Sequence, residues 1–336
     1  MAEKAAFFPG AAGHLLLSAS YFLLFNRGVD SNMKQEEKPQ IAAALGMFDG
    51  VHLGHRRVLQ EAKALGTCNA VTFASETMPE KQGFPLRYIY HDEQKRRLLT
   101  ACGADAVFAL PFGEFRDLDG ETFCKRILCD QLHVTQVVCG EDFRFGRRAA
   151  CNADDLVRIG QRLGFHVMLV PQIKDEHNLP VSSSHIRFLL ESGQLTAANR
   201  LLGADYQILA QVVTGQQLGA KLFGVPTANQ VFEPWQCIPR RGVYASFAEI
   251  NDIWMPAITN IGMRPTVSGE KTEIVAETHL IGFSGDLVGS LLPVTLCRFM
   301  RPEQKFDSAE ALALQMQRDI HARTKLLADT EKLSAD

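Results

Sequence analysis

The stretch 41-IAAALGMFDGVHLGHRRVLQ-60 decides the fold of the first half of this chain. Its first five residues form a short apolar, strand-like run, and a helical pattern of apolar residues begins at His55. His52 and His55 bracket Gly54 at the point where the strand gives way to the helix. A strand followed directly by a helix predicts the first unit of an α/β fold.

The alternation of strand-like and helical runs continues as far as residue 170. Five such strands with intervening helices predict an open parallel sheet with right-handed crossovers. In such a sheet ligands bind beyond the carboxyl ends of the strands, and the unusual polar and aromatic loops follow those ends. We expect strands at 41–45, 70–73, 105–110, 134–139 and 166–170, and helices at 55–65, 92–102 (with Asp92 as N-cap), 120–132 and 153–163.

The pattern changes after two short helical runs at 184–193 and 194–203. From Tyr206 to about Phe299, β-rich segments alternate with Gly- and Pro-rich turns, which predicts a closed antiparallel barrel. The expected strands are 206–213, 243–250, 257–262, 273–281 and 294–300, followed by an amphipathic helix at 308–328. We therefore expect four parts: an N-terminal extension outside the fold at 1–40, an α/β domain at 41–188, a helical linker at 189–205 and a barrel domain at 206–329.

Composition limits the class of protein. The chain has 336 residues, more than one average domain, and 46% of them are hydrophobic, which is ordinary for a globular protein. A formal net charge of -3 gives no reason to expect nucleic acid as the main partner. Eight cysteines without a C-x-x-C pair favour reduced thiols in a cytosolic protein over zinc ligands.

The N-terminus contains the apolar run 14–25, which is too short for a membrane span of about 20 residues. Met33 opens a polar stretch directly before the first strand. We hypothesise that Met33 is the natural start and that residues 1–32 have no role in the fold.

Two imidazoles at a helix entrance suit a bound polyphosphate. Gly54 lets the backbone come close to the anion, and the free N–H groups and dipole of the helix add positive potential. Such a site stabilises the charge that develops as a nucleotide α-phosphate is attacked and pyrophosphate leaves. The alternative is that His52 and His55 only cap or pack the helix.

A second segment, 181-VSSSHIR-187, offers hydroxyl groups near a helix start and then Arg187. Ser182, Ser183 and the arginine suit phosphate binding. The alternative is an ordinary N-cap with a solvated arginine.

A third segment, 224-GVPTAN-229, places oxygens on Thr227 and Asn229, which share a face in an extended chain. Two neutral oxygen ligands together with nucleotide phosphates suit Mg²⁺, although a simple turn is the alternative. Glu277 lies in a strand-like run, where a carboxylate could accept the proton of an attacking hydroxyl group or simply face solvent.

Taken together, these motifs resemble the bacterial bifunctional riboflavin kinase/FMN adenylyltransferase (FAD synthetase) family. The matching stretches run in family order from about residue 41 to 325: FDGVHLGH, GEDFRFG, VSSSHIR, FGVPTAN, RRGVYA, NIGMRPTV, ETHLIGFSGDL and RPEQKF. The resemblance implies a Rossmann-like nucleotidylyltransferase domain with a parallel sheet, followed by an antiparallel β-barrel riboflavin kinase domain with a C-terminal helix.

The resemblance also implies roles for individual residues. It makes Glu277 the base that activates the riboflavin hydroxyl group, and it places His52 and His55 on the ATP phosphates and the transition state. Thr227 and Asn229 would hold Mg²⁺. The nucleotide phosphates would also contact Asp49, Gly54, Ser182, Ser183, Arg187, Gly219 and Lys221, and the flavin would contact Phe73, Asp142, Phe143, Phe145 and Arg301.

The implied function is phosphorylation of riboflavin to FMN with ATP, then adenylylation of FMN to FAD with release of pyrophosphate. We expect a cytoplasmic enzyme, a monomer or weak oligomer, that acts on small molecules and binds neither nucleic acid nor membrane. His185, Ala220 and Val288 depart from the family pattern. The alternatives are a chain with one active module, the kinase being the more doubtful, a non-catalytic flavin- or nucleotide-binding protein, and an HxGH transferase for another substrate.

Overall fold

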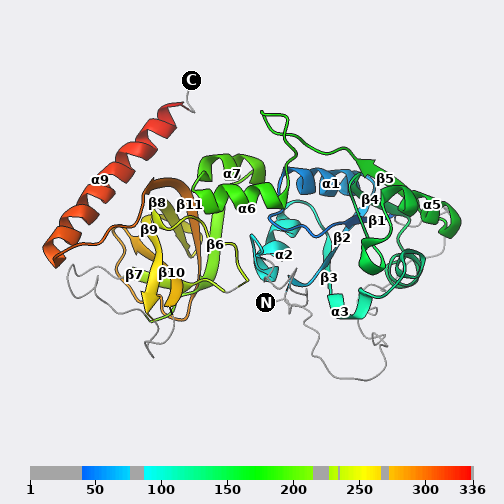
Figure 1. Cartoon of the computed structure of the whole chain (residues 1–336), viewed down its shortest axis with the longest axis horizontal. Helices are drawn as coiled ribbons and strands as arrows, with labels where there is room; N and C mark the ends of the chain where they lie inside the picture. Colours follow the sequence, from blue (N-terminus) through cyan, green and yellow to red (C-terminus); the bar gives the residue numbers. More distant parts are fainter. Residues whose placement is uncertain (1–39, 76–86, 215–226, 234, 266–271, 334–336) are drawn as a thin grey trace, which may run out of the picture. The chain divides into compact units, whose positions relative to one another are not determined.

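A five-stranded parallel sheet forms the first module, with strand order β3-β2-β1-β4-β5 (Figure 1). The computed structural model describes residues 40–75, 87–214, 227–233, 235–265 and 272–333. Central β1 pairs in parallel with both β2 and β4, so the strand order reverses between β1 and β4. Sheets of this kind bind ligands at that switch point, which the loops after β1 and β4 flank. The predicted parallel sheet is thus confirmed, with strands β1 (Ile41–Leu45), β2 (Thr67–Phe73), β3 (Ala106–Leu110), β4 (Gln136–Gly140) and β5 (His166–Val170).

Helices cover both faces of this sheet. Ala42 and Ala44 of β1 are buried in one hydrophobic cluster with residues of α1 and α2, whereas Ala43 belongs to a second cluster with residues of α5 and the helical segment before β4. A strand buried on both faces explains why the opening run is apolar throughout. The helical segments are α1 (Leu53–Ala64), α2 (Asp92–Ala101), α3 (Phe112–Phe115), α4 (Gly120–Phe123), the π-helix η3 (Cys124–Gln131), the short 3₁₀ helix η4 (Arg147–Ala149) and α5 (Ala153–Leu163).

Two local predictions in this module differ from the structure. The helix expected over 120–132 is present, but its second half, η3, has π rather than α hydrogen bonding. The N-cap of α2 is His91, whose Nδ1 accepts from the N–H of Gln94 at 3.3 Å. Asp92 is not the cap because its carboxylate accepts instead from the N–H and the hydroxyl group of Ser75, both at 2.7 Å.

The second module is a curled six-stranded antiparallel sheet, with strand order β6-β11-β8-β9-β10-β7. An antiparallel bridge between Val213 and Asn229 brings the chain after β6 to the far edge strand, as the barrel prediction requires. Strand β7 was not among the predicted strands, because its polar TANQ sequence lacks an apolar alternation. The strands are β6 (Tyr206–Gln211), β7 (Thr227–Val231), β8 (Gly242–Ile250), β9 (Ile253–Pro265), β10 (Thr272–Leu280) and β11 (Leu291–Arg301).

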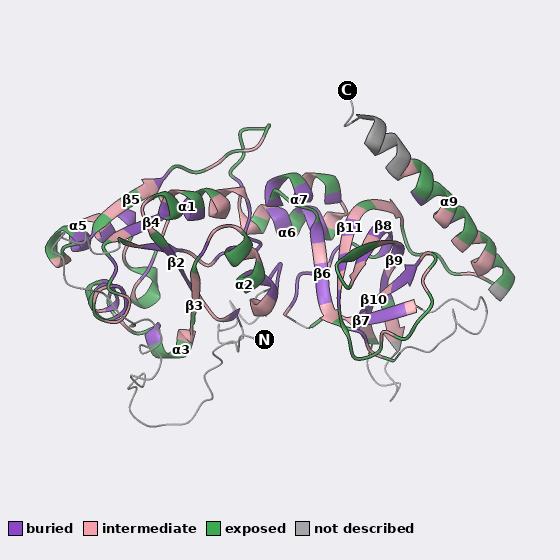
Figure 2. Ribbon diagram, turned by 180° about the vertical axis from the view of Figure 1, so that it is seen from behind, coloured by how far each residue is buried: buried purple, intermediate pink, exposed green. Residues whose placement is uncertain are grey.

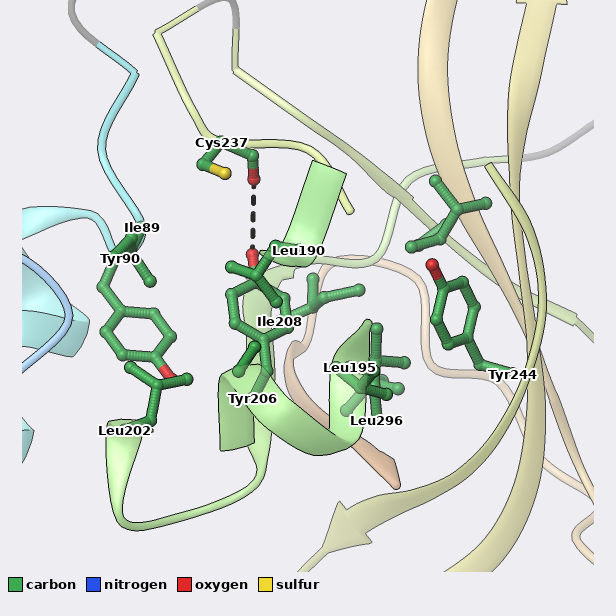
Figure 3. Close-up of a cluster of buried hydrophobic side chains, with 14 of the residues drawn as sticks. Ile89, Tyr90, Leu190, Leu195, Leu202, Tyr206, Ile208, Cys237, Tyr244 and Leu296 are labelled. Atoms are coloured by element: carbon green, nitrogen blue, oxygen red, sulfur yellow. Dashed lines mark hydrogen bonds between the residues drawn. The ribbon is translucent and has the colours of Figure 1, made fainter. Parts of the chain in front are cut away.

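Helices α6 (Ser183–Ser192) and α7 (Leu195–Leu202) join the two modules and share one hydrophobic cluster with the barrel. Ile89 and Tyr90, which precede α2, belong to the same cluster. Tyr206 is fully buried there, stacks on Tyr90 at 5.5 Å between ring centroids, and donates its hydroxyl hydrogen to the carbonyl oxygen of Cys237 at 3.4 Å (Figure 3). Residues from both modules therefore contribute to one core.

The C-terminal helix α9 (Ala309–Leu333) begins after Ser308, whose Oγ accepts from the N–H of Ala311 at 3.2 Å, as predicted. Much of α9 is exposed (Figure 2), but Arg323 is buried and donates to the carbonyl oxygens of Ala257 and Ser246 at 3.0 and 3.1 Å. Along the described part of the chain, no helix combines the length and apolar character that crossing a membrane requires.

Candidate active sites

The first site lies at the N-terminus of α1. His52 is the N-cap, and its Nδ1 accepts from the N–H of His55 at 3.4 Å. The two imidazole rings stack with centroids 3.6 Å apart and planes inclined by 17°. A Cβ on Gly54 would lie 3.2 Å from the His52 ring, so glycine leaves room for this stacking. The expected pairing of the two histidines at the helix start is present, and His52 also takes the capping role of the alternative interpretation.

Both imidazoles are neutral in this environment. Burial lowers the pKa of His52 to about 4, and His52 is only 6% exposed. Burial also lowers the pKa of His55 well below its ordinary value, with smaller effects from His52 and from the charge of Lys95. Nδ1 of His55 is buried and has no hydrogen-bond partner among the described residues. A buried polar atom without a partner is costly, so this nitrogen is suited to a ligand.

Asp49 connects this loop with the serine-rich segment. Its carboxylate accepts from Nη1 of Arg187 at 2.5 Å and from the N–H of Ile89 at 2.8 Å, and its carbonyl oxygen accepts from the hydroxyl group of Ser183 at 2.8 Å. Burial raises the pKa of Asp49, and the Arg187 charge opposes that rise. The structure thus brings the 49–55 loop and the start of α6 together.

The serine-rich segment takes the capping role of the alternative interpretation, and phosphate binding there stays a prediction. Oγ of Ser182 caps α6 by accepting from the N–H of His185 at 3.3 Å, which is the ordinary capping role. Arg187, in contrast, is not simply solvated: besides Asp49 it contacts Oγ of Ser184 at 3.1 Å. His185 is half-buried on the helix.

Lys95 of α2 is a site residue that the sequence analysis missed. The residue is only 3% exposed, and Nζ donates to the carbonyl oxygen of Phe73 at 2.9 Å and contacts Oδ1 of Asp92 at 3.0 Å and Oγ of Ser75 at 3.3 Å. These polar contacts connect the end of β2 with α2. A lysine in a charged helical run gives no sequence signal that it is buried.

The predicted flavin residues of this module lie at two strand ends. Phe73 ends β2 and meets Phe112 edge to face, with centroids 5.2 Å apart. In the loop after β4, Asp142 is exposed, and half-buried Phe143 stacks on Phe145 at 5.7 Å. Phe145 is 7% exposed and belongs to the hydrophobic core of the sheet, so packing occupies most of its surface.

The second site is one face of the barrel around β7 and β10. In this antiparallel pair Asn229 lies opposite Glu277, and Thr227 lies opposite His279. Directly opposed residues share a face, as do residues two apart on one strand. The register therefore gathers these four side chains on one face. Thr227 and Asn229 share a face, as predicted, and Glu277 and His279 of β10 lie on that face with them.

Asn229 has the geometry of a ligand residue. It is 3% exposed, and its Nδ2 donates to the carbonyl oxygen of Thr227 at 3.2 Å. Its Oδ1 is buried without a hydrogen-bond partner among the described residues. A neutral amide oxygen left free in this way fits a magnesium ion, which binds oxygen ligands and retains water. Within the described ranges, no three His, Cys, Asp or Glu side chains gather as a possible metal site.

Glu277 is a partly buried carboxylate in a charged surrounding. Burial raises its pKa, the Arg264 charge opposes that rise, and Glu303 adds to it. A Cβ on Gly262 would lie 2.3 Å from Oε1 of Glu303, so a side chain at this position would displace that carboxylate. Nη1 of Arg264 is buried without a partner among the described residues. Arg264 and Glu303 were not singled out from the sequence, although both lie in motifs that carry the resemblance.

Arg301 has an evident structural role. Its guanidinium group is paired with the carboxylate of Asp319 on α9 at 2.8 Å, and it lies over the ring of Phe306. Contact of Arg301 with a flavin stays a prediction. Val288 is 55% exposed, whereas Gly219, Ala220 and Lys221 lie outside the described residues.

A parallel sheet with two buried histidines and an arginine–aspartate pair beside its switch point, joined to a barrel that bears a carboxylate and an amide oxygen on one face, fits a two-module transferase. The FAD synthetase family model matches residues 34–185, and the riboflavin kinase family model matches residues 202–327.

Relatives of known name agree with this class. The bifunctional riboflavin kinase/FMN adenylyltransferase of Pseudomonas fluorescens is 34% identical over 313 residues, covering 88% of this chain and 96% of its own length. The protein of the same name from Escherichia coli K12 is 32% identical over 308 residues, covering 87% of this chain and 94% of its own. The chain belongs to the bifunctional riboflavin kinase/FMN adenylyltransferase family.

One solved structure shares the two-module fold. It is described as a macrolide-efflux protein from Streptococcus pneumoniae, and it superposes with a TM-score of 0.72 at 27% identity. The match covers 85% of this chain and 94% of that chain.

Proposed function

We propose that this chain phosphorylates riboflavin to FMN in its barrel and adenylylates FMN to FAD at the α/β sheet. The observation that carries the proposal is the presence of both sites in one chain. Each has a buried polar atom that is free of partners among the described residues: Nδ1 of His55 in the first site and Oδ1 of Asn229 in the second.

In the barrel, Glu277 accepts the proton of the riboflavin 5′-hydroxyl group while that oxygen attacks the γ-phosphorus of ATP and ADP leaves. Its raised pKa makes the carboxylate a better proton acceptor than an exposed glutamate. Thr227 and Asn229 would hold Mg²⁺ together with the nucleotide phosphates and water. When bound, the ion neutralises phosphate charge.

At the sheet, an oxygen of the FMN phosphate attacks the α-phosphorus of ATP, and the bond to the departing pyrophosphate breaks. His52 and His55 are neutral, so each ring can donate one hydrogen bond to a phosphate oxygen. The free N–H groups at the start of α1 add positive potential there. Arg187 and Ser183, held at Asp49, would border the phosphates.

Several finer assignments belong to this proposal. Gly54 and Ser182 would admit and border the phosphates, and Gly219 and Lys221 would cover the ATP bound to the barrel. Phe73, Asp142, Phe143, Phe145 and Arg301 would contact flavin directly or shape its pocket. We further propose that the enzyme works in the cytoplasm, where its eight free cysteines would stay reduced. Its partners would be riboflavin, FMN and ATP.

The test is to incubate the protein with riboflavin, ATP and Mg²⁺ and to separate the flavins by chromatography. Formation of FMN followed by FAD is the expected result. A second incubation begins with FMN, so that each step is measured alone. FMN that is never converted would refute the adenylyltransferase assignment, and riboflavin that is never converted would refute the kinase assignment.

A further inference from the structure

Besides His55 in the first module, a histidine on the barrel face that carries Glu277 has a ring nitrogen without a partner among the described residues. His279 is 7% exposed, and its Nδ1 is buried with no hydrogen-bond partner among the described residues. Buried side-chain nitrogens in native proteins are almost always hydrogen-bonded, so an exception requires an explanation. The cost of leaving such a group unpaired is about 1–3 kcal/mol.

The register of β10 explains where the missing partner lies. His279 is directly opposite Thr227 and two residues beyond Glu277, so its side chain projects from the face that carries Asn229. The opposite face of these strands contributes Ala228, Ala276 and Leu280 to the hydrophobic core, so His279 does not point into that core. Two atoms that lack a partner within the described ranges, Nδ1 of His279 and Oδ1 of Asn229, therefore belong to residues of one face.

We propose that His279 is a further substrate-contact residue of the kinase site, whose Nδ1 forms a hydrogen bond with the phosphate end of the bound magnesium–nucleotide. The proposal rests on the kinase function proposed above. Thr227 and Asn229 mark the phosphate end because their oxygens would hold the cation. His279 lies beside Thr227, so its nitrogen meets a phosphate oxygen or a water of the cation rather than the flavin ring.

Two substitutions separate the ring nitrogens. In H279N the amide occupies the position of Nδ1, whereas in H279Q it occupies the position of Nε2. We expect H279Q to raise the KM for ATP in FMN formation about 10- to 100-fold, the effect of losing a hydrogen bond to a charged group. H279N should stay within about threefold of the parent, because hydrogen bonds of this kind need only a polar atom at the same place. H321Q, at an exposed histidine of α9, is the matched control.

FAD formation from FMN in each variant reports whether the chain is folded. If H279N and H279Q raise the KM equally, the role of His279 is structural and the proposal is wrong. If H279Q shifts the KM for riboflavin and not that for ATP, the contact is with the flavin and the proposal is again overturned.

A second readout does not need catalysis. The protein is labelled with ¹⁵N-histidine, and the spectrum of H279Q identifies the ring signals of His279 among the 10 histidines. The Nδ1 signal should move when a magnesium complex of a non-hydrolysable ATP analogue is added, and not when riboflavin is added alone. An unmoved signal would overturn the proposal. If the parent chain makes no FMN, the kinase function fails, and this spectrum still decides whether His279 contacts the nucleotide.

Discussion

His55 is the residue on which the adenylyltransferase assignment depends most directly. Its ring stacks on His52, and its Nδ1 has no protein partner in the described structure. We expect H55A to lower the rate of FAD formation from FMN about 100- to 1,000-fold, as loss of one donor to a developing charge does. FMN formation from riboflavin should persist, because the barrel does not use His55. H166A, at an exposed histidine of β5, is the matched control; loss of both activities in H55A would contradict the assignment.

Glu277 allows the reciprocal experiment. E277Q keeps the shape of the side chain and removes its ability to accept a proton, so FMN formation should fall about 100- to 10,000-fold. FAD formation from added FMN should be unchanged. E273Q on the same strand is the control, since Glu273 meets Arg264 only at 3.7 Å. Chromatography of the flavins measures both steps, and an E277Q protein with normal kinase activity would refute the role of Glu277 as base.

At the scale of elements, the sequence predicts regular units well and their exceptions poorly. The five parallel strands follow from apolar runs such as that of β1, whose burial on both faces leaves little ambiguity. The π character of η3 was not predicted, because an apolar pattern of eight residues does not separate i→i+5 from i→i+4 hydrogen bonding. Strand β7 was missed because its ligand-type residues replace apolar ones, and Lys95 was missed because its burial depends on partners far away in sequence.

The ion pair between Arg301 and Asp319 attaches α9 to the end of β11. Asp319 is 8% exposed and pairs with Arg301, so D319N leaves a partly buried guanidinium group without its counter-charge. We expect the free energy of unfolding to fall by about 2–4 kcal/mol, as when one partner of a buried ion pair is removed. E121Q breaks the exposed pair of Glu121 with Arg162, in which both side chains are 55% exposed, and should cost less than about 1 kcal/mol. Urea unfolding measures both, and equal costs would contradict the anchoring role.

For the whole molecule, the sequence predicts two modules and their resemblance to a family, because each motif is a short continuous stretch that can be recognised without the structure. It does not predict how distant segments are joined, such as Arg187 with Asp49 or Tyr90 with Tyr206. Those contacts depend on the packing of side chains far apart in the chain, and no periodicity records them. We therefore expect the stability of the two modules to be coupled.

Acid should destabilise the folded chain through its buried histidines. The pKa of His52 falls from 6.5 to about 4 on burial, and that of His55 is also lowered. The unfolded chain therefore binds more protons between these values, so stability is full above about pH 6.5 and is lost as the pH falls toward about 4. The contribution of His52 is at most roughly 3 kcal/mol, since one pKa unit corresponds to about 1.4 kcal/mol.

Urea unfolding of the parent and of H52N/H55N at about pH 7 and about pH 5 isolates this contribution. The loss of stability between the two pH values should be larger in the parent. An equal loss in both proteins would show that the histidines are not buried in their neutral form.

The shared core predicts that both modules unfold together. Tyr206 begins β6 and is fully buried between the barrel and Tyr90, so a cavity there would weaken the contact between the modules. Y206A should lower the free energy of unfolding by about 3–5 kcal/mol, as truncation of a buried aromatic residue does. Y206F removes only the hydroxyl group, with its hydrogen bonds to Cys237 and Gln236, and should cost about 1 kcal/mol.

Scanning calorimetry gives the decisive measurement. The parent and Y206F should show a single cooperative transition, because Ile89 and Tyr90 of the first module belong to the hydrophobic cluster of the second. In Y206A that cluster loses a fully buried ring, and the transition should separate into two as each module unfolds at its own temperature. Two transitions in the parent would mean that the cluster does not couple the modules, and the two catalytic sites would then stand on independently stable parts of the chain.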